Sequence, residues 1–313
     1  MIHVAAAAIF DAEGRVLVTK RADHMHQGGL WEFPGGKREP GESMEQALAR
    51  ELDEELGIQP LAYDPLIRIR HSYGERRLQL EFFRVTRYRG RARGLEAQPL
   101  KWLLPSEMDP HSFPAADRPV ITALRLPSRY LITGEDAAQT NSFLKRLESS
   151  LAQGLGIVQL RAHGLADERY RELLSASLTR CRLQGARLIV NRPAGVVDWL
   201  GEADGIHFTA RQLMLLSRRP PGAGLMGASC HNPEELTRAA QLQLDYALLS
   251  PVGETPSHPH APTLGWSRFA EWVDGVNIPV YALGGMRRDS LAQAKRAGAQ
   301  GIAGISTFWA VNP

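Results

Sequence analysis

The spacing of hydrophobic and polar residues changes character near residue 125. Before that point the alternation predicts a mixture of strands and helices, which is an α+β arrangement. The expected strands cover residues 2–10, 15–21, 65–72, 77–87 and 98–103, and the expected helices cover residues 44–56 and 116–125. The apolar run that opens the chain reaches Asp11 too early to span a bilayer, so it is expected to form a buried strand.

From Tyr130 onward, short apolar runs are separated by helical segments. The runs are YLIT, GIVQLR, ARLIVN, DGIHF, LMGASC, YALLSPV, PVYALGG and GIAGIS. Eight strands that alternate with helical connections predict a parallel sheet, and eight such units close a (β/α)8 barrel. The predicted domains are therefore residues 1–126 and 130–313, joined by RLPSR at 125–129. The second domain is short for a barrel, so several connections are expected to be minimal.

Composition adds a broad class and a compartment. The chain has 313 residues, of which 43% are hydrophobic and 23% charged, with a net charge of +3, as expected for a two-domain globular protein. The arginines are scattered, so stable nucleic-acid binding is not expected, and small phosphate-bearing molecules suit the charge as well as polymers do. Cys181 and Cys230 provide no disulfide framework or zinc site, which predicts a reducing, cytoplasmic location without membrane association.

The segment GGKREPGESMEQALARELDEELGI, residues 35–58, concentrates six glutamates and one aspartate around a single predicted helix. Ser43 followed three residues later by Gln46 resembles a capping box, and Gly57 predicts the end of the helix. Like charges at helical spacing repel each other, so this accumulation of carboxylates requires a balancing charge.

Glu51, Glu54 and Glu55 are spaced so that their carboxylates are predicted to converge on one face of this helix. Hard divalent cations such as Mg²⁺ take oxygen ligands of this kind. The alternative is a solvated acidic surface. The spacing of the whole segment favours the metal, since it runs Gly36, five residues, Glu42, seven residues, Arg50-Glu51-Leu52, one residue, Glu54-Glu55, one residue, Gly57-Ile58.

That spacing resembles the Nudix box, the motif of hydrolases that cleave nucleoside diphosphates linked to other groups. The resemblance implies that Glu51, Glu54, Glu55 and the carbonyl of Gly36 hold Mg²⁺, with Mn²⁺ as an alternative cofactor. It also implies that Arg50 and Glu42 form a structural ion pair, which positions the loop on the helix and takes no part in the reaction.

The flanking segments resemble the MutT-type 8-oxo-dGTP diphosphatases. KRADHMHQGGLWEFPGGK carries Arg21, His26 and Phe33 in what looks like the nucleotide-binding stretch, and FPAADRPVI at 113–121 resembles the base-recognition segment. LEAQPLKW places Glu96 where the family has a further acid near the metals. The resemblance implies that Arg21 contacts phosphate or ribose. Without it, His26 would be read as a loop histidine and Phe33 as a core residue.

One residue departs from this pattern. Asp117 stands where MutT-type enzymes carry an asparagine that reads the oxidised base. An ionised aspartate only accepts hydrogen bonds and can take two N–H donors of guanine, whereas an aspartate whose pKa is raised by burial also donates. Purine recognition is expected to persist, and the preference for the 8-oxo form is left open.

The resemblance also implies a mechanism and a role. Water activated by metal would attack the β-phosphorus of a nucleoside triphosphate and release a nucleoside monophosphate and pyrophosphate. Glu51 is the predicted general base, with Glu96 as the alternative. The expected function is sanitation of the nucleotide pool in DNA repair, by hydrolysis of 8-oxo-dGTP to 8-oxo-dGMP.

The second domain resembles the thiamine phosphate synthase and TenI superfamily. VQLR, LIVN, DGIHF, GASCHNPEEL, LLSPVGETPSH, VYALGGM and GIAGIS occur in the order of that family. The resemblance implies that a phosphorylated small molecule binds at the carboxyl-terminal rim of the barrel. The expected phosphate-binding residues are Gln159, Arg161, Gly284, Gly285 and Ser306. The two glycines alone would be read as a tight turn.

The charged residues of the synthases are missing. Acids expected directly after Asn191 and after Phe208 are absent from NRPAG and HFTARQL, and His163 and His258 stand where lysines are expected. Without these charges a departing pyrophosphate loses its stabilisation, so thiamine phosphate synthesis is not expected. The alternatives are binding of a thiazole phosphate-like ligand, a metal-free reaction of the TenI kind, or structural support of the hydrolase.

Two other hypotheses for the whole chain remain. The Nudix-like domain would hydrolyse a pyrophosphorylated thiamine precursor, or the barrel would sense a phosphorylated metabolite and regulate the hydrolase. Release of pyrophosphate from a panel of nucleotides and thiamine precursors distinguishes them.

Overall fold

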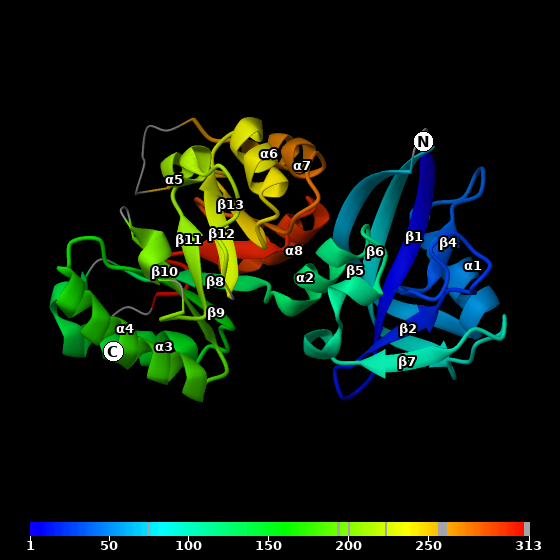
Figure 1. Ribbon diagram of the computed structural model, residues 1–313, viewed down its shortest axis with the longest axis horizontal. Helices are drawn as coiled ribbons and strands as arrows, with labels where there is room; N and C mark the ends of the chain where they lie inside the picture. The colour runs from blue at the N-terminus through cyan, green and yellow to red at the C-terminus, as the bar shows by residue number, and fades with distance from the viewer. Residues whose placement is uncertain are drawn as a thin grey trace. The chain divides into compact units, whose positions relative to one another are not determined.

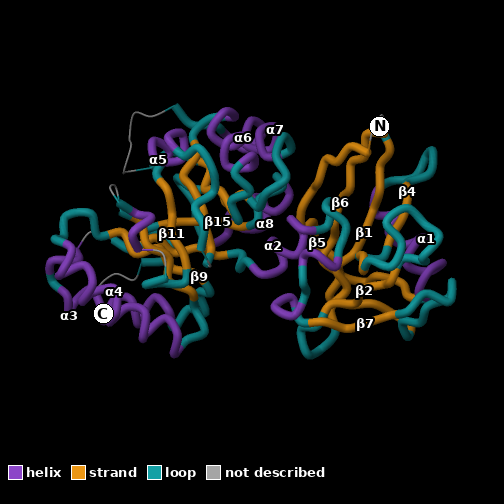
Figure 2. Tube along the Cα trace, in the orientation of Figure 1, coloured by secondary structure: helices purple, strands orange, loops and turns teal. Residues whose placement is uncertain are grey.

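A computed structural model describes residues 1–73, 76–134, 136–192, 195–199, 201–222, 224–255 and 262–309 (Figures 1 and 2). Contacts between Cα atoms divide the chain into two compact units, Met1–Arg125 and Leu126–Pro313. Each unit has its own sheet and its own core. In the part of the chain that the structure describes, no helix combines the length and the hydropathy needed to cross a membrane.

The first unit is built on a seven-stranded sheet with the order β3-β2-β1-β6-β5, in which β4 also pairs with β1 and β7 with β2. The parallel pair is β1–β6, and the other pairings are antiparallel. The strands are β1 (Ile2–Phe10), β2 (Val16–Lys20), β3 (Trp31–Glu32), β4 (Gly35–Lys37), β5 (Ile58–Tyr73), β6 (Arg76–Gly90) and β7 (Leu100–Leu103).

Helices cover both faces of this sheet because its strands alternate between two cores. Ala5, Ala7 and Ile9 of β1 pack with helix α1 (Met44–Leu56), whereas Ala6 and Ala8 face the core that contains helix α2 (Arg118–Arg125). Two 3-10 turns, Pro105–Glu107 and Pro110–Ser112, lead into α2. The α+β prediction is confirmed.

Helix α1 begins and ends where the sequence predicts. The Ser43 hydroxyl accepts from the backbone N–H of Gln46, and the Gln46 side chain accepts from the backbone N–H of Ser43, so the capping box is present. Gly57 ends the helix in the left-handed region at φ 66°. The predicted apolar stripe of Leu48, Leu52 and Leu56 is buried.

The central hairpin is longer than predicted. Strand β5 already begins at Ile58, although Pro60 and Pro65 argue against a strand there. Since β5 lies at the edge of the sheet, each proline needs pairing on one side only, and shifts in register around Ala62 and Leu66 absorb the irregularity. The two short strands β3 and β4 were not predicted, because they are defined by pairing with β2 and β1 rather than by periodicity.

The second unit is a closed barrel of eight parallel strands, as predicted. The strands are β8 (Arg129–Ile132), β9 (Ile157–Arg161), β10 (Arg187–Asn191), β11 (Gly205–Phe208), β12 (Leu225–Cys230), β13 (Tyr246–Leu249), β14 (Val280–Ala282) and β15 (Gly301–Gly304). The helices are α3 (Thr140–Leu151), α4 (Asp167–Leu183), α5 (Ala210–Leu215), α6 (Pro233–Gln241), α7 (Gly265–Val273) and α8 (Leu291–Arg296). In the described part of the connection between β10 and β11, one 3-10 turn, Val196–Trp199, takes the place of a helix, so that connection is short as expected.

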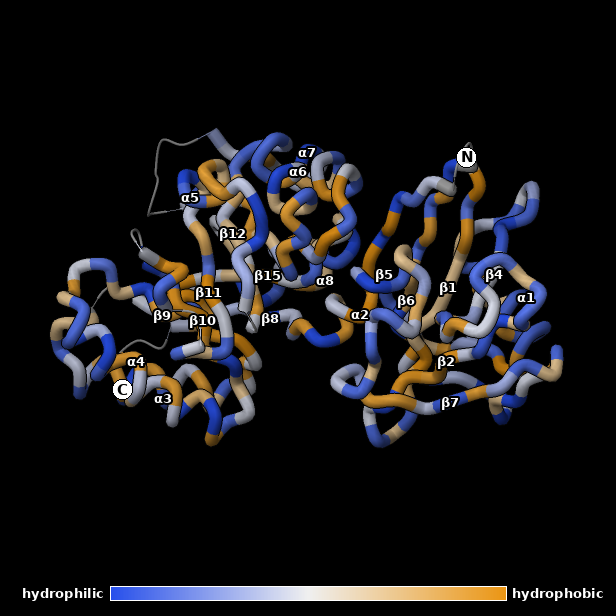
Figure 3. Tube along the Cα trace, viewed as in Figure 1, coloured by the Kyte–Doolittle hydropathy of each residue, from blue (hydrophilic) through white to orange (hydrophobic). Residues whose placement is uncertain are grey.

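The hydropathy pattern explains the layers of the barrel. Strands are the most apolar segments (Figure 3), and their outward side chains join those of the helices in one large cluster. The inward cluster is smaller and contains three tyrosines, Tyr130, Tyr246 and Tyr281. The hydroxyls of Tyr130 and Tyr246 lie 2.9 Å apart, and that of Tyr281 donates to the carbonyl of Pro127, so these buried polar groups are satisfied.

Candidate functional site

The acidic helix meets a glycine pair on β4. The carboxylate of Glu51 lies directly against Gly36, where an added Cβ would come within 2.3 Å of the carboxyl carbon. The carboxylate of Glu55 accepts a hydrogen bond from the backbone N–H of Gly35 at 3.1 Å. Gly35 has φ 142°, and an added Cβ there would come within 2.1 Å of the Ala5 carbonyl oxygen. Glycine is therefore required at residue 36 for the approach to the Glu51 carboxylate and at residue 35 for the close pairing of β4 with β1.

Several carboxylates converge at this point. Burial raises the pKa of Glu55 to about 7, against the hydrogen bond from Gly35, which lowers it; the charges of Glu51, Glu32 and Glu96 raise it further. Glu96 belongs to a loop that is attached to the helix, because Gln98 accepts from the Glu96 N–H and donates to the Glu55 carbonyl. Gathered acids of this kind are stabilised by a cation.

Arg50 is the local counter-charge. Its guanidinium contacts the carboxylates of Glu42, Glu51 and Glu54 at 2.8, 2.9 and 3.1 Å, and it donates to the Lys37 carbonyl. The hydrogen bond to Glu42 raises the pKa of Arg50 more than any other contact. The expected structural ion pair between Arg50 and Glu42 is confirmed. Glu54 differs from Glu51 in that its side chain is 59% exposed, against 15%.

The residues fit a divalent cation, although the described residues hold no preassembled group of three or more His, Cys, Asp or Glu side chains for one. Glu51 and Glu55 meet at β4, whereas Glu54 is turned to Arg50 and solvent. Oxygen donors on a cradle that leaves no room for a Cβ are suited to a hard ion such as Mg²⁺.

A second group of predicted residues lies on the other side of the sheet. Arg21 forms an ion pair with Glu32 and donates to the backbone carbonyl of His26 at 3.1 Å. The His26 side chain is exposed. Phe33 is 4% exposed and packs against Phe82 and Phe113, each with ring centroids 5.8 Å away, so it belongs to the core.

Asp117 is buried beside Phe33, Glu32 and Arg21. Burial raises its pKa to about 8 and the charge of Glu32 adds to this, whereas a backbone hydrogen bond from Phe33 and the charge of Arg21 lower it. A pKa raised to about 8 favours the protonated carboxyl at neutral pH, and in that form it has one donor and one acceptor, the same pair that an asparagine amide has. The structure thus brings together Arg21, Phe33 and Asp117, which lie far apart in the sequence.

Glu32 is the residue that sequence reasoning missed. Its charge acts on Asp117 and on Glu55, so it lies between the predicted base-reading and metal-binding groups. Burial raises the pKa of Glu32 despite the ion pair with Arg21. The pairing of β3 with β2, which places Glu32 opposite Thr19, is the feature that would have identified it.

The barrel residues predicted to bind phosphate are placed at different depths. Gln159 is 2% exposed and donates to the Tyr130 hydroxyl at 3.2 Å, so it lies inside the barrel. Arg161, two residues later, ends β9 and lines a pocket of about 290 Å³ together with residues 137–138 and 162–165. Ser306 follows β15 and is exposed.

Gly284 and Gly285 follow β14 and pack tightly on the loop after β13. Their φ angles are 91° and 67°, and an added Cβ would meet Pro251 at 2.9 Å and the Glu254 carbonyl at 2.6 Å. In the closed order β14-β15-β8-β9, Ser306 follows the strand next to the glycine pair, whereas Arg161 ends a strand two positions beyond β15 on the same rim. The arrangement suits a ligand bound through backbone N–H groups.

The two residues that stand where synthase acids are expected from the resemblance make structural contacts. Arg192, directly after Asn191, donates to the carbonyls of Ala162 and Leu165 and forms an ion pair with Asp167 at 2.7 Å. Its guanidinium also lies over the Tyr170 ring. In the other position, Thr209 caps helix α5.

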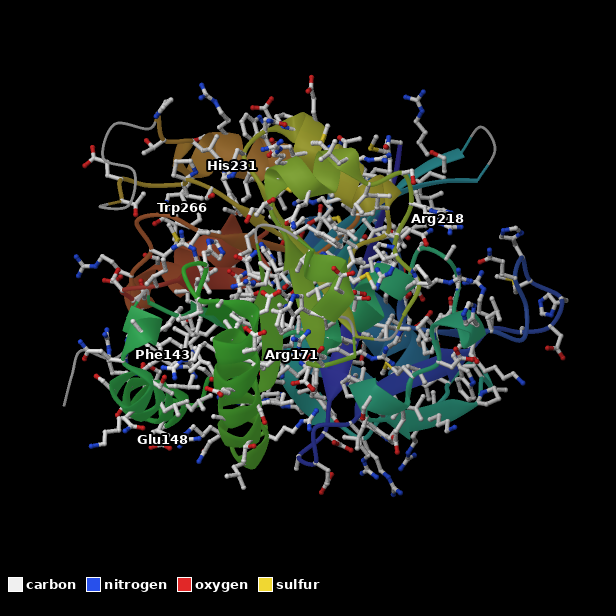
Figure 4. All side chains as sticks on the ribbon, turned by 60° about the vertical axis from the view of Figure 1, so that its left-hand side comes forward. Phe143, Glu148, Arg171, Arg218, His231 and Trp266 are labelled. Carbon is white, nitrogen blue, oxygen red and sulfur yellow. The ribbon has the colours of Figure 1, made fainter. Side chains whose placement is uncertain are left out.

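Two histidines lie near this rim. The His163 Nε2 lies 2.8 Å from the Asn191 side chain. His231, labelled in Figure 4, follows β12, and its Nδ1 lies 2.9 Å from the Ser250 carbonyl. Sequence reasoning did not select His231, although its place directly after a barrel strand is typical of functional residues in this fold. His258 lies outside the described residues.

Known proteins resemble each unit separately. The sequence profile of thiamine monophosphate synthases (TMP-TENI) matches residues 129–308, and that of the NUDIX domain matches residues 5–123. A thiamine-phosphate synthase of Thermus thermophilus is 33% identical over 175 residues, covering 55% of this chain and 84% of the relative. The 8-oxo-dGTP diphosphatase of Escherichia coli is 36% identical over 124 residues, covering 40% of this chain and 96% of the relative.

The CTP pyrophosphohydrolase of Escherichia coli is 38% identical over 123 residues, covering 39% of this chain and 90% of the relative. The two nucleotide hydrolases match stretches of nearly equal length at similar identity. The likeness therefore identifies a Nudix hydrolase domain, but it does not identify the base of the nucleotide substrate. The chain therefore belongs to the thiamine monophosphate synthase family and carries, ahead of that domain, a Nudix hydrolase domain with MutT-type relatives.

Proposed function

We propose that the first unit is a Mg²⁺-dependent nucleoside triphosphate pyrophosphohydrolase, with 8-oxo-dGTP as the leading substrate and protection of DNA from oxidised nucleotides as its role. The observation that carries this proposal is the convergence of Glu51 and Glu55 on the Gly35–Gly36 backbone. This convergence supports the proposal because adjacent carboxylate oxygens are ligands of the kind that a phosphate-bound Mg²⁺ ion takes.

The proposed metal ligands are the carboxylates of Glu51, Glu54 and Glu55 and the carbonyl of Gly36, with assistance from Glu96. A bound Mg²⁺ or Mn²⁺ ion would neutralise phosphate charge and lower the pKa of a coordinated water. Among these residues, Glu54 is exposed and must leave Arg50 to become a ligand.

Glu51 is the proposed general base. Arg50 holds it at 2.9 Å and Gly36 closes the space behind it, so its carboxylate is fixed in orientation. A fixed carboxylate can accept a proton from the attacking water without reorganisation. Glu96 is the alternative base, since its loop is attached to Glu55 through Gln98.

The neutral carboxyl of Asp117 is the proposed base reader. Its hydroxyl would donate to an acceptor on the base and its carbonyl would accept from an adjacent N–H. The 8-oxoguanine edge formed by O6 and N7–H offers this pair, and so do the cytosine edge formed by N3 and N4–H and the adenine edge formed by N7 and N6–H. Unmodified guanine offers two acceptors, N7 and O6, on the edge that corresponds to that of 8-oxoguanine. The likeness to a CTP pyrophosphohydrolase makes cytosine the second candidate base.

A screen for pyrophosphate release tests the proposal. The substrates are 8-oxo-dGTP, dGTP, CTP and dCTP, ATP, and the pyrimidine pyrophosphate used in thiamine synthesis. Preference for 8-oxo-dGTP over dGTP supports the proposal, and preference for cytosine nucleotides selects the second base. Similar rates on all compounds, or hydrolysis of the thiamine precursor alone, would reject sanitation of nucleotides as the function.

For the barrel, the arrangement favours binding of a phosphorylated small molecule at Gly284, Gly285, Ser306 and Arg161 without synthesis of thiamine phosphate. The observation that favours this role is the engagement of Arg192 with Asp167 and two carbonyls, which leaves the place of a synthase acid to a structural contact. Direct binding of a thiazole phosphate to the full chain, measured by calorimetry, tests it. Absence of binding would leave the barrel as a support for the hydrolase.

A further inference from the structure

Strand β6 and the residues after it carry a concentrated positive charge. Residues 84–93, RVTRYRGRAR, contain five arginines and no acidic residue. All five side chains are exposed. We call this group the arginine surface, and its members are Arg84, Arg87, Arg89, Arg91 and Arg93.

A bulge in β6 aligns the strand arginines. Tyr63 pairs with Val85 and Ala62 with Arg87, so Thr86 is left out of the register. Val85 and Tyr88 pack toward the core beside α1. Because side chains alternate on a strand, Arg84, Arg87 and Arg89 project from the opposite face. Without the bulge, Arg84 and Arg87 would lie on opposite faces.

Among the described residues, four of the five members of the arginine surface lack counter-charges; the exception is Arg84, whose cross-strand neighbour is Asp64. Within the described ranges no carboxylate forms an ion pair with Arg87, Arg89, Arg91 or Arg93. Their cross-strand neighbours are uncharged, since Arg87 pairs with Ala62 and Arg89 with Gln59. In contrast, Arg68 on the adjacent strand contacts Glu81 at 3.4 Å. Adjacent like charges without partners repel each other, so an external anion would stabilise them.

Protection of the sheet edge explains only part of these charges. Charged residues and prolines that prevent edge-to-edge aggregation belong on unpaired edges. The outermost strand is β5 (Figure 1), which already carries Pro60 and Pro65. The pairing of β6 with β1 ends at Val85, so Arg87 and Arg89 lie where β6 is paired with β5 alone. Arg84 lies in the part of β6 that has a strand on each side, and Arg91 and Arg93 follow the end of β6.

The shape of the arginine surface indicates the kind of anion. Alternate residues on a strand are about 6.7 Å apart and Thr86 is left out of the register, so the row from Arg84 through Arg87 to Arg89 extends over about 13 Å. A ligand that contacts the whole row must carry phosphates or carboxylates repeated along its length. The planar guanidinium fork matches phosphate oxygens in pairs, which favours a phosphate polymer.

We propose that the arginine surface binds the phosphate backbone of a nucleic acid. The binding is independent of sequence and sensitive to salt, because it rests on charge and because the row presents no aromatic side chain on which bases could stack. The scatter of arginines over the whole chain does not reveal this surface, since the strand register and its bulge bring the residues together. The proposal does not depend on which triphosphate the first unit hydrolyses.

Fluorescence anisotropy of the full chain with labelled oligonucleotides of about 20 residues, single-stranded and duplex, tests the proposal at about 50 to 200 mM salt. The expected result is binding that weakens steeply with salt. For single strands, Arg87→Gln/Arg89→Gln should reduce the slope of log K against log salt by about 1.4, which corresponds to two phosphate contacts. The duplex arm shows whether both forms bind.

The matched control is Arg211→Gln/Arg218→Gln, which removes two exposed arginines from the barrel unit and should leave binding unchanged. Arg218 is labelled in Figure 4. Circular dichroism and retained triphosphate hydrolysis verify that the variants fold, and Arg91→Gln/Arg93→Gln provides a second test of the surface. Absence of binding, equal loss in the control, equal affinity for polyglutamate, or displacement by pyrophosphate at equal phosphate concentration would each overturn the proposal.

Discussion

The carboxylate of Glu51 lies so close to Gly36 that a β carbon at residue 36 would come within 2.3 Å of it. We therefore expect Gly36→Ala to displace the carboxylate and to reduce kcat for triphosphate hydrolysis by about a hundredfold, the scale of a misplacement near 1 Å. Steady-state kinetics on the purified variant measure this. Gly164→Ala is the control, because a Cβ there meets no atom within 4 Å. Normal kcat in Gly36→Ala would remove Glu51 from the reaction.

Glu54 tests the metal site. Glu54→Gln keeps the shape of the side chain and removes its charge, so activity should fall by about a hundredfold or more while the fold persists. Activity over a Mg²⁺ titration and the melting temperature are the measurements. Glu45→Gln, an exposed first-turn residue of the same helix, should have no effect. If Glu54→Gln keeps both turnover and Mg²⁺ dependence, Glu54 is not a ligand.

The buried carboxyl of Asp117 predicts how stability depends on pH. Its pKa is about 8 in the folded protein against 3.8 ordinarily, so between these values the folded state holds a proton that the unfolded state releases. Bound in the folded state, this proton makes its full contribution to the free energy of unfolding below pH 3.8, the ordinary pKa of the group. The contribution falls as pH rises toward 8, by at most about 1.4 kcal/mol per pH unit.

Denaturant unfolding of the wild type and of Asp117→Asn from pH 5 to pH 8 measures this contribution, since the amide does not titrate. The difference in unfolding free energy between the two proteins should change steadily over that range. A constant difference would show that Asp117 is ionised throughout.

Asp117 also predicts specificity. Asp117→Ala should raise KM for nucleotides that carry the base contacted by Asp117. The increase should correspond to a loss of about 1 to 3 kcal/mol in binding free energy, whereas KM for nucleotides of the other class of base should scarcely change. Asp117→Asn should restore most of the affinity, because the amide presents the same donor and acceptor. An equal increase in KM for purine and pyrimidine nucleotides would make Asp117 a structural residue.

The barrel prediction is an absence of synthesis. Given a pyrimidine pyrophosphate, a thiazole phosphate and Mg²⁺, the full chain should form no thiamine phosphate, because Arg192 and Thr209 stand where acids are needed. The experiment uses the Glu54→Gln variant so that the first unit does not consume the pyrophosphate. A thiamine-phosphate synthase of Thermus thermophilus is the positive control. Clear turnover by this chain would show that other groups replace the missing acids.

The sequence predicts those features of the fold that local spacing determines. The capping box of α1 and the eight apolar runs of the barrel are of this kind, because each is defined by residues within one turn or one strand. The short strands β3 and β4 depend on pairing with distant segments, and Glu32 was missed with them.

The sequence does not predict how deep inside the barrel a side chain lies. Gln159 and Arg161 lie on the same side of β9, yet one contacts the tyrosine core and the other reaches a pocket at the rim. The sequence also does not predict the raised pKa of Asp117, since that shift results from burial and from the charge of Glu32. Spacing can identify a candidate acid, but its protonation depends on the folded surroundings.

The contacts of Arg192 make this residue difficult to replace by an acid. Replacing it by aspartate would leave the carbonyls of Ala162 and Leu165 without their donor and would place a second acid beside Asp167. The rings of Tyr170 and Trp199 would lose the cation that lies over them. Under the proposal that the barrel does not synthesise thiamine phosphate, gain of that activity would therefore require coordinated changes at several positions, each unfavourable until the others are made.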